Sequence, residues 1–276
     1  MGSVRAELLL LTKRPATWVL VALPIVMSLL FGYILPYSSY VSGPADGVPA
    51  TDLRDMLPER MVPSLLEGVP FYLGMVALIL GVLAVGSEYG WGTWKTVLMQ
   101  QPRRLHLFGA KLAAVAAILA VSTLSIFAVA AISSYAVAWR ENAPTDWPAA
   151  WDVARGMGAA WLILTLWAMF GVLLAVLSRG TALAIGLGIL YGLVVEGLIA
   201  GLGSDLPLVQ DAAQAFLRTN GYSLVAPLGA SVAEGGEPGA FAGPFVDAWQ
   251  ALLVILGYLA LFASVSALAI RQRDVS

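Results

Sequence analysis

The segment at residues 88–102 carries the residue types that most readily suggest chemistry in this chain. Glycines, threonines and a lysine follow one another from Gly90 to Thr96, a composition found in loops that bind nucleotide phosphates. Such a loop needs a glycine directly before its lysine, whereas here Trp94 precedes Lys95. It also needs a strand before it and a soluble α/β sheet around it, and this segment lies between long apolar runs. We therefore expect no nucleotide site within this chain.

Other catalytic or metal chemistry finds little support in the sequence. The chain has a single histidine, His106, and no cysteine, so no second histidine or thiolate is present to share a metal ion. An enzyme that acts within a membrane needs several polar side chains gathered inside apolar segments, and these segments carry almost none. We therefore expect no catalytic residue, no metal site and no cofactor bound by this chain.

Glu196 is the exception, because it lies inside the apolar run at residues 181–203. A helix that rises about 1.5 Å per residue places it about 22 Å from the inner end of that run, in the outer half of a membrane. An ionisable group is costly at this depth and by default indicates function. The carboxylate could contact a cargo molecule, lie at the seam of a dimer, pair with a polar neighbour, or reach the outer surface. The sequence leaves these alternatives open.

Glycines recur around Glu196 at a spacing that allows another helix to approach closely. Gly188 and Gly192 are four residues apart, and Gly197 and Gly201 repeat the interval. We expect this helix to pack tightly, either within its own bundle or against a second copy. Gly188 and Gly192 are therefore candidates, together with Glu196, for contact with the cargo or for the seam of a dimer.

The composition of the chain indicates in which class of protein these residues lie. Hydrophobic residues make up 59% of the chain and charged residues 12%, against about 45–50% and about 25% in soluble domains. Six charge-poor runs reach the roughly 17–25 residues that a membrane-spanning helix needs. They lie at residues 18–36, 69–86, 112–138, 157–178, 181–203 and 248–270. Because they lack the alternation of strands, we predict an all-α integral membrane protein with six transmembrane helices in one domain, residues 1–276.

The distribution of basic residues predicts the orientation of the spans. Ten of the fifteen lie in the segments at one side of the six-span topology, and this excess predicts that both termini face the cytoplasm. These ten are Arg5, Lys13, Arg14, Lys95, Arg103, Arg104, Lys111, Arg179, Arg271 and Arg273. A cleaved signal peptide competes for the first run, but that run is longer than a typical signal and no Ala-x-Ala-like site follows.

Two further helices are predicted outside the spans. Residues 1–15 have helical spacing of apolar and basic residues, which favours a helix in the inner interface. The basic residues of this segment could serve only to set the membrane orientation, or the segment could form part of a docking surface. In the outer loop, residues 204–247, apolar positions from Val209 to Leu217 predict a short amphipathic helix. Asp205 is its expected start and Asn220 with Gly221 its expected stop. It could lie on the surface or re-enter the bundle.

The spacing within residues 88–104 favours a short helix across the inner membrane surface. Trp94, Val97 and Leu98 share one face, with Lys95 on another, and Pro102 stops the helix. Such a helix fits a groove on a cytoplasmic partner. An interfacial loop anchored by its tryptophans is the alternative.

The chain resembles the permease subunits of type-2 ABC exporters. The similarity is most specific in the motif Glu-Tyr-Gly-x-Gly-Thr-x-Lys-Thr that starts at Glu88. Pro-Arg-Arg follows this motif, and Lys111 stands at the start of the third span. The resemblance covers nearly the whole chain, and it implies a coupling segment that docks on a separate ATP-binding subunit. The residues implied are Glu88, Gly90, Gly92, Thr93, Trp94, Lys95, Val97 and Leu98. It also implies two permeases, identical or homologous, and two ATPases in the cell membrane, with ATP and Mg on the ATPases.

One departure limits the resemblance, since the second inner loop, around Arg179, is too short for a full second coupling helix. We therefore expect a non-enzymatic permease that exports an amphipathic or lipid-like compound, antibiotic, peptide or polysaccharide. A secondary transporter or a non-transporting membrane partner is the alternative.

Overall fold

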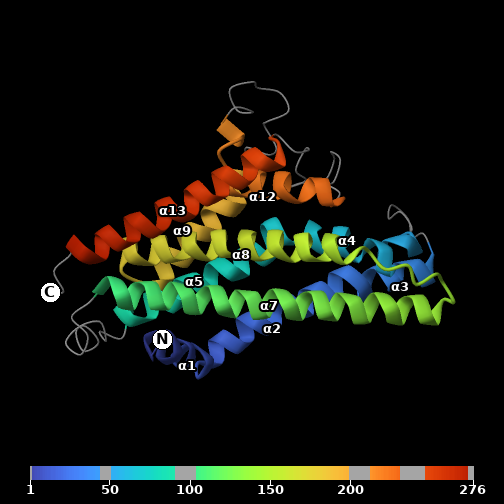
Figure 1. Ribbon diagram of the computed structural model, residues 1–276, viewed down its shortest axis with the longest axis horizontal. Coiled ribbons are helices and arrows are strands. Elements are labelled where there is room, and N and C mark those ends of the chain that lie inside the picture. Colours follow the sequence, from blue (N-terminus) through green and yellow to red (C-terminus); the bar gives the residue numbers. More distant parts are fainter. Residues whose placement is uncertain (1, 44–50, 91–103, 199–211, 231–245, 273–276) are drawn as a thin grey trace.

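The computed structural model describes residues 2–43, 51–90, 104–198, 212–230 and 246–272. Every regular element within these residues is helical (Figure 1). The α-helices are α1 (Gly2–Thr12), α2 (Pro15–Leu29), α3 (Leu35–Ser42), α4 (Met61–Glu67), α5 (Gly74–Gly90), α7 (Arg104–Arg140), α8 (Ala150–Ser178), α9 (Thr181–Leu190), α12 (Leu217–Val225) and α13 (Ala248–Gln272). Three π-helices are η1 (Leu30–Ile34), η4 (Val69–Leu73) and η5 (Tyr191–Val195). Short 3-10 turns are η2 (Leu53–Met56), η3 (Pro58–Arg60) and η6 (Ala226–Leu228).

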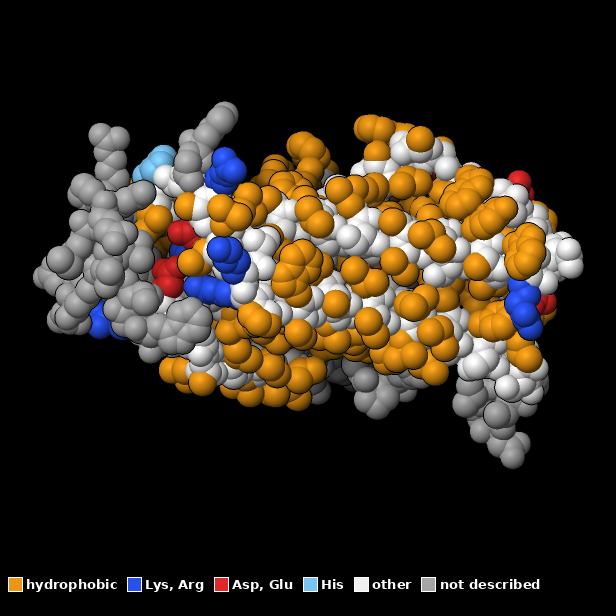
Figure 2. Space-filling view, turned by 90° about the horizontal axis from the view of Figure 1, so that it is seen from below, with side chains coloured by type: hydrophobic (Ala, Val, Ile, Leu, Met, Phe, Trp, Pro, Cys, Tyr) orange, Lys and Arg blue, Asp and Glu red, His pale blue; other side chains and the backbone are white. Residues whose placement is uncertain are grey.

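Within the described residues, six helical stretches are long and apolar enough to cross a membrane, which confirms the predicted all-α membrane fold. They are Pro15–Ser42, Val69–Tyr89, Leu105–Arg140, Ala150–Ser178, Thr181–Leu198 and Ala248–Gln272. On the face in Figure 2, hydrophobic side chains cover the middle of the molecule and charged ones gather toward its two ends. This distribution matches a bilayer with a hydrocarbon centre and polar boundaries.

The ends of the spans differ from the predicted ends for identifiable reasons. The first span begins at Pro15, because a proline fits the first turn of a helix, where its missing N–H is not needed. The third begins before Lys111, since this lysine is enclosed by protein and does not mark a boundary. At 37 residues, α7 is about 55 Å long and exceeds the hydrocarbon core of about 30 Å.

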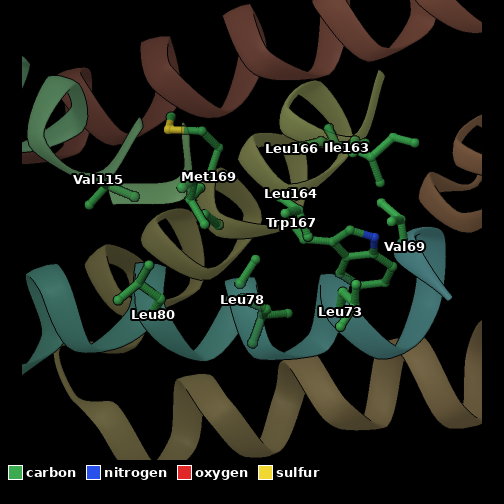
Figure 3. Packing of buried hydrophobic residues seen from close by; sticks show 14 of the residues in the cluster. Val69, Leu73, Leu78, Leu80, Val115, Ile163, Leu164, Leu166, Trp167 and Met169 are labelled. Atoms are coloured by element: carbon green, nitrogen blue, oxygen red, sulfur yellow. The ribbon is translucent and has the colours of Figure 1, made fainter. Parts of the chain in front are cut away.

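Helices α5 and α8 form the centre of the bundle and pack backbone against backbone. A Cβ at Gly81 would collide with the Ala168 carbonyl, and one at Gly171 would collide with the Leu78 carbonyl. Small residues allow this contact, which is a main source of helix association in lipid. Figure 3 shows Leu78 on α5 below Leu164 and Trp167 on α8. The central pair therefore holds a fixed register.

The outer helices are far less enclosed by protein. Only 11% of the most apolar window in the first span is buried, and 22% in the fifth and in the sixth. The corresponding windows of the second and fourth spans are 72% and 61% buried. Helix α1, the end of α5, the start of α7 and the end of α13 all lie at the same end of the bundle (Figure 1). We call this the inner end and the opposite one the outer end.

Most of the predicted outer-loop helix lies outside the described residues, but its predicted end can be compared with the structure. Residues 212 and 213 are helical, but the main helix, α12, begins at Leu217, so Asn220 and Gly221 lie inside it. The prediction that this pair ends the helix was wrong. The Asn220 side-chain amide donates to the carbonyls of Gln214 and Phe216, both at 2.8 Å, and thereby stabilises the turn before it. Asp205 and Val209 lie outside the described residues.

Candidate functional site

The inner end contains a buried ion-pair cluster centred on Lys111. Lys111 lies in the second turn of α7, its ammonium fully enclosed by protein. It donates to Glu7 of α1 at 2.8 Å and to Glu88 of α5 at 2.5 Å. Glu7 and Glu88 are themselves only 7% and 5% exposed. We call these three residues the inner joint.

Two further contacts attach α1 and the start of α2 to the inner joint. Leu11 on α1 is 1% exposed, so it anchors the apolar face of that helix in the core. Arg14 donates to the Leu83 carbonyl at 3.2 Å and to the Ser87 hydroxyl at 2.7 Å, both on α5. Arg14 therefore brings a second cation to the turn that carries Glu88. The two glutamates are thus accompanied by two basic side chains.

The three charged side chains of the inner joint depend on one another for their stability. An isolated charge in a low-dielectric interior is strongly disfavoured, and a paired one is tolerated when its hydrogen bonds are satisfied. Removing one partner of such a pair costs about 3–5 kcal/mol, because the charge that remains is uncompensated. The joint therefore resists separation of α1, α5 and α7.

The inner joint lies beside both ends of the predicted coupling segment. The described part of α5 extends to Gly90 and that of α7 starts at Arg104, so the helices on either side of the segment are the two that carry Glu88 and Lys111. Glu88 was predicted to belong to the docking surface, and the structure places its carboxylate in the protein interior instead. The other predicted coupling residues, Gly92, Thr93, Trp94, Lys95, Val97 and Leu98, lie outside the described residues.

Sequence reasoning missed the partnership of Glu7 with Lys111. These residues are 104 positions apart, so no local spacing connects them. The sequence did contain one signal for this partnership. Glu7, Glu88 and Lys111 are all predicted at the same membrane boundary, where the two carboxylates can compensate the charge of the lysine.

The outer half also contains a buried carboxylate, that of Glu196, which is 2% exposed. Its two oxygens accept from the backbone N–H of Arg218, at 3.2 and 3.1 Å. Tyr191 and the Leu217 backbone also hydrogen-bond this carboxylate. Helix α12 begins at Leu217, so Glu196 binds the positive end of a helix dipole. Among the roles left open by the sequence, this geometry corresponds to pairing with a polar neighbour.

Helix α12 is polar yet largely buried, and aromatic rings surround its arginine. The Arg218 guanidinium lies 4.5 Å from the centre of the Phe71 ring and 5.6 Å from that of Tyr222. Burial raises the pKa of the Tyr222 hydroxyl, and the nearby Arg218 charge opposes that rise. The Tyr258 hydroxyl of α13 donates to the Ala215 carbonyl at 2.6 Å just before α12. Helix α12 is thus integrated into the bundle.

Gly188 and Gly192 pack against α5 of the same chain. A Cβ at Gly188 would meet the Leu78 side chain at 2.7 Å, and one at Gly192 would collide with the end of Met75. A Cβ at Gly197 would meet no described atom within 4 Å. The first glycine pair therefore serves close packing within the bundle.

The described residues form a multi-pass α-helical membrane protein, with the inner joint at one end and the helix-capping carboxylate of Glu196 in the outer half. Residues 18–276 match the family model described as "Protein of unknown function (DUF2705)", so the chain belongs to that family. No curated protein matches the sequence.

Proposed function

We propose that this chain is the transmembrane permease subunit of an ATP-driven ABC exporter. The observation that best supports the proposal is the inner joint, because it connects α5 and α7, the two helices that flank residues 91–103. A segment that receives force from a cytoplasmic motor needs such an attachment. The motif from Glu88 and the six-span architecture support the same conclusion.

In the proposed mechanism, the coupling segment moves when the partner subunit binds or hydrolyses ATP. Lys111 keeps α5, α7 and α1 together during this movement, since separating them would expose unpaired charges in the interior. Helix α5 passes the displacement to α8 through the backbone contacts at Gly81 and Gly171. The cytoplasmic motion thereby reaches the outer half without any chemistry in this chain.

The proposal assigns ATP and Mg to a separate ATP-binding subunit. Two such subunits would act with two permeases, identical or homologous, in the cell membrane. Both termini and the coupling segment then face the cytoplasm, as the basic residues predict. The exported compound would be amphipathic or lipid-like, an antibiotic, a peptide or a polysaccharide.

Purification of the native complex tests the proposal. The tagged chain is extracted from its own membranes in mild detergent, and native mass spectrometry identifies the accompanying chains. We expect an ATP-binding protein in equal copy number with the permease. A homogeneous complex without an ATP-binding chain would contradict the proposal and favour a secondary transporter or a non-transporting membrane partner.

A further inference from the structure

A cleft of about 320 Å³ lies between the first span and the segment that leads into the second. One wall is formed by the end of α2 and η1, including Ser28, Phe31 and Gly32. The other is formed by α4 and η4, including Glu67 and Tyr72. Both walls thus contain a π-helix, an irregularity that is often found at functional sites.

Two glycines open the cleft. A Cβ built at Gly32 or at Gly68 would meet no other described atom within 4 Å, and both residues line the cleft. Side chains could therefore occupy this space without displacing described neighbours, yet the sequence has glycine on each wall. One water molecule takes up about 30 Å³ in the liquid, so the volume of the cleft is enough for about ten non-hydrogen atoms of that size.

The position of the cleft determines how a ligand could reach it. Gly32 lies 17 residues after Pro15, so it is about 26 Å from the inner end of the span, in the outer half of the membrane. The residues Phe31 and Tyr72 are 60% and 58% exposed. Because the first span is mostly uncovered by protein, the cleft opens toward lipid. A ligand that enters from lipid must carry an apolar portion.

The charge on the cleft wall indicates the head group of that ligand. Glu67 is the charged residue among the lining side chains, and Ser28, Ser64 and Tyr72 add hydroxyl groups. A carboxylate has about four acceptor positions, so it can receive a ligand N–H in addition to contacts within the protein. Arg218 is 4% exposed, stacks on Phe71 and is not part of the lining. Within the described residues, the lining thus offers a carboxylate acceptor and no basic side chain, which disfavours an anionic head group.

We propose that this cleft binds a single-chain amphiphile with a protonated amine head group, the alkyl chain lying along Phe31 and Gly32 and the amine beside Glu67. A charge-assisted hydrogen bond from the ammonium to the carboxylate orients the molecule. Binding does not require ATP. A role of the site in export additionally rests on the proposed function.

Photolabelling of the full chain in phosphatidylcholine nanodiscs tests the proposal. The probe is dodecylamine with a diazirine on its alkyl chain, and mass spectrometry locates the labelled peptides. We expect labelling at residues 27–33 and 64–73, reduced at least fivefold by excess dodecylamine and less than twofold by dodecyl sulfate. Labelling spread evenly over the lipid-facing helices, or equal competition by both detergents, would overturn the proposal.

Variants separate the cleft from general partitioning into lipid. Gly32→Leu fills the cleft and should lower labelling about tenfold, whereas Gly257→Leu, at an open position on α13, should leave it unchanged. Glu67→Gln keeps the side-chain size and should remove the preference for dodecylamine over dodecanol as competitor. Unchanged labelling in Gly32→Leu, or an unchanged preference in Glu67→Gln, would reject the assignment. Since ATP and the ATPase are absent from this assay, its failure would leave the exporter proposal standing.

Discussion

The inner and outer regions each bury a carboxylate but compensate its charge differently. At the inner joint, Glu88 pairs with the ammonium of Lys111 on another helix. In the outer half, Glu196 binds the backbone N–H of Arg218 at the start of a nine-residue helix. The inner arrangement links three elements through full charges. The outer one links a span to a short helix mainly through hydrogen bonds from neutral groups, with the Arg218 charge nearby, and its loss should therefore cost less.

The backbone is also more regular in the inner region than in the outer region. The inner halves of α5 and α7 are continuous α-helix, whereas the first, second and fifth spans each contain a π-helix toward their outer ends. Pro36 follows η1 and Pro70 lies within η4, and each lacks the N–H that a regular helix would use. We infer that the inner end moves as one body, while the outer end has the irregular backbone at which helices can bend.

The largest effect is expected from Lys111→Met, which leaves two buried glutamates without their shared cation. The expected loss of stability is about 3–5 kcal/mol. Thermal unfolding in detergent, followed by size-exclusion chromatography, measures it. Lys13→Met is the matched control, because Lys13 is exposed. Equal melting of both variants would show that the inner joint contributes nothing to stability.

A triple variant sharpens this test. Glu7→Gln, Lys111→Met and Glu88→Gln together remove all three charges of the inner joint. We expect the triple variant to recover part of the stability lost in Lys111→Met alone, because no buried carboxylate is left without its ammonium partner. A triple variant that is less stable than Lys111→Met would mean that packing rather than charge dominates.

An intermediate effect is expected at the outer carboxylate. Glu196→Leu leaves the N–H groups at the start of α12 unpaired, and the expected cost is about 1–3 kcal/mol. Glu196→Gln keeps an acceptor oxygen and should cost less. Glu59→Leu, at an exposed position, is the control for the added apolar side chain. If both Glu196 variants keep wild-type stability but lose export, cargo contact rather than helix capping is the main role of Glu196.

The smallest effect is expected from the glycine that faces a flexible side chain. Gly192→Ala should be tolerated with a loss below about 1 kcal/mol, because its Cβ displaces only the far end of Met75. Gly171→Ala should cost about 1–3 kcal/mol, since its Cβ meets the rigid Leu78 backbone. Thermal unfolding of the two variants compares them directly. The reverse order would contradict the helix packing described here.

Much of the fold was predictable because length and hydropathy decide whether a segment can span a membrane. The sequence was less informative where a polar group finds a partner far along the chain. Lys111 was read as a boundary because its partner Glu7 lies on a distant helix. Asn220 was read as a stop because its hydrogen bonds to Gln214 and Phe216 belong to the folded turn. The three π-helices likewise produce no distinct pattern of apolar residues.

Recovery of the ATP-binding subunit with coupling-segment variants tests the central claim most directly. We expect Trp94→Ala combined with Leu98→Ala to lower co-purification of that subunit at least tenfold while the permease keeps its wild-type yield. Trp249→Ala combined with Leu253→Ala is the matched control, since it removes the same residue types at the same spacing from exposed positions on α13. Equal recovery of the ATP-binding subunit with both double variants would contradict the account.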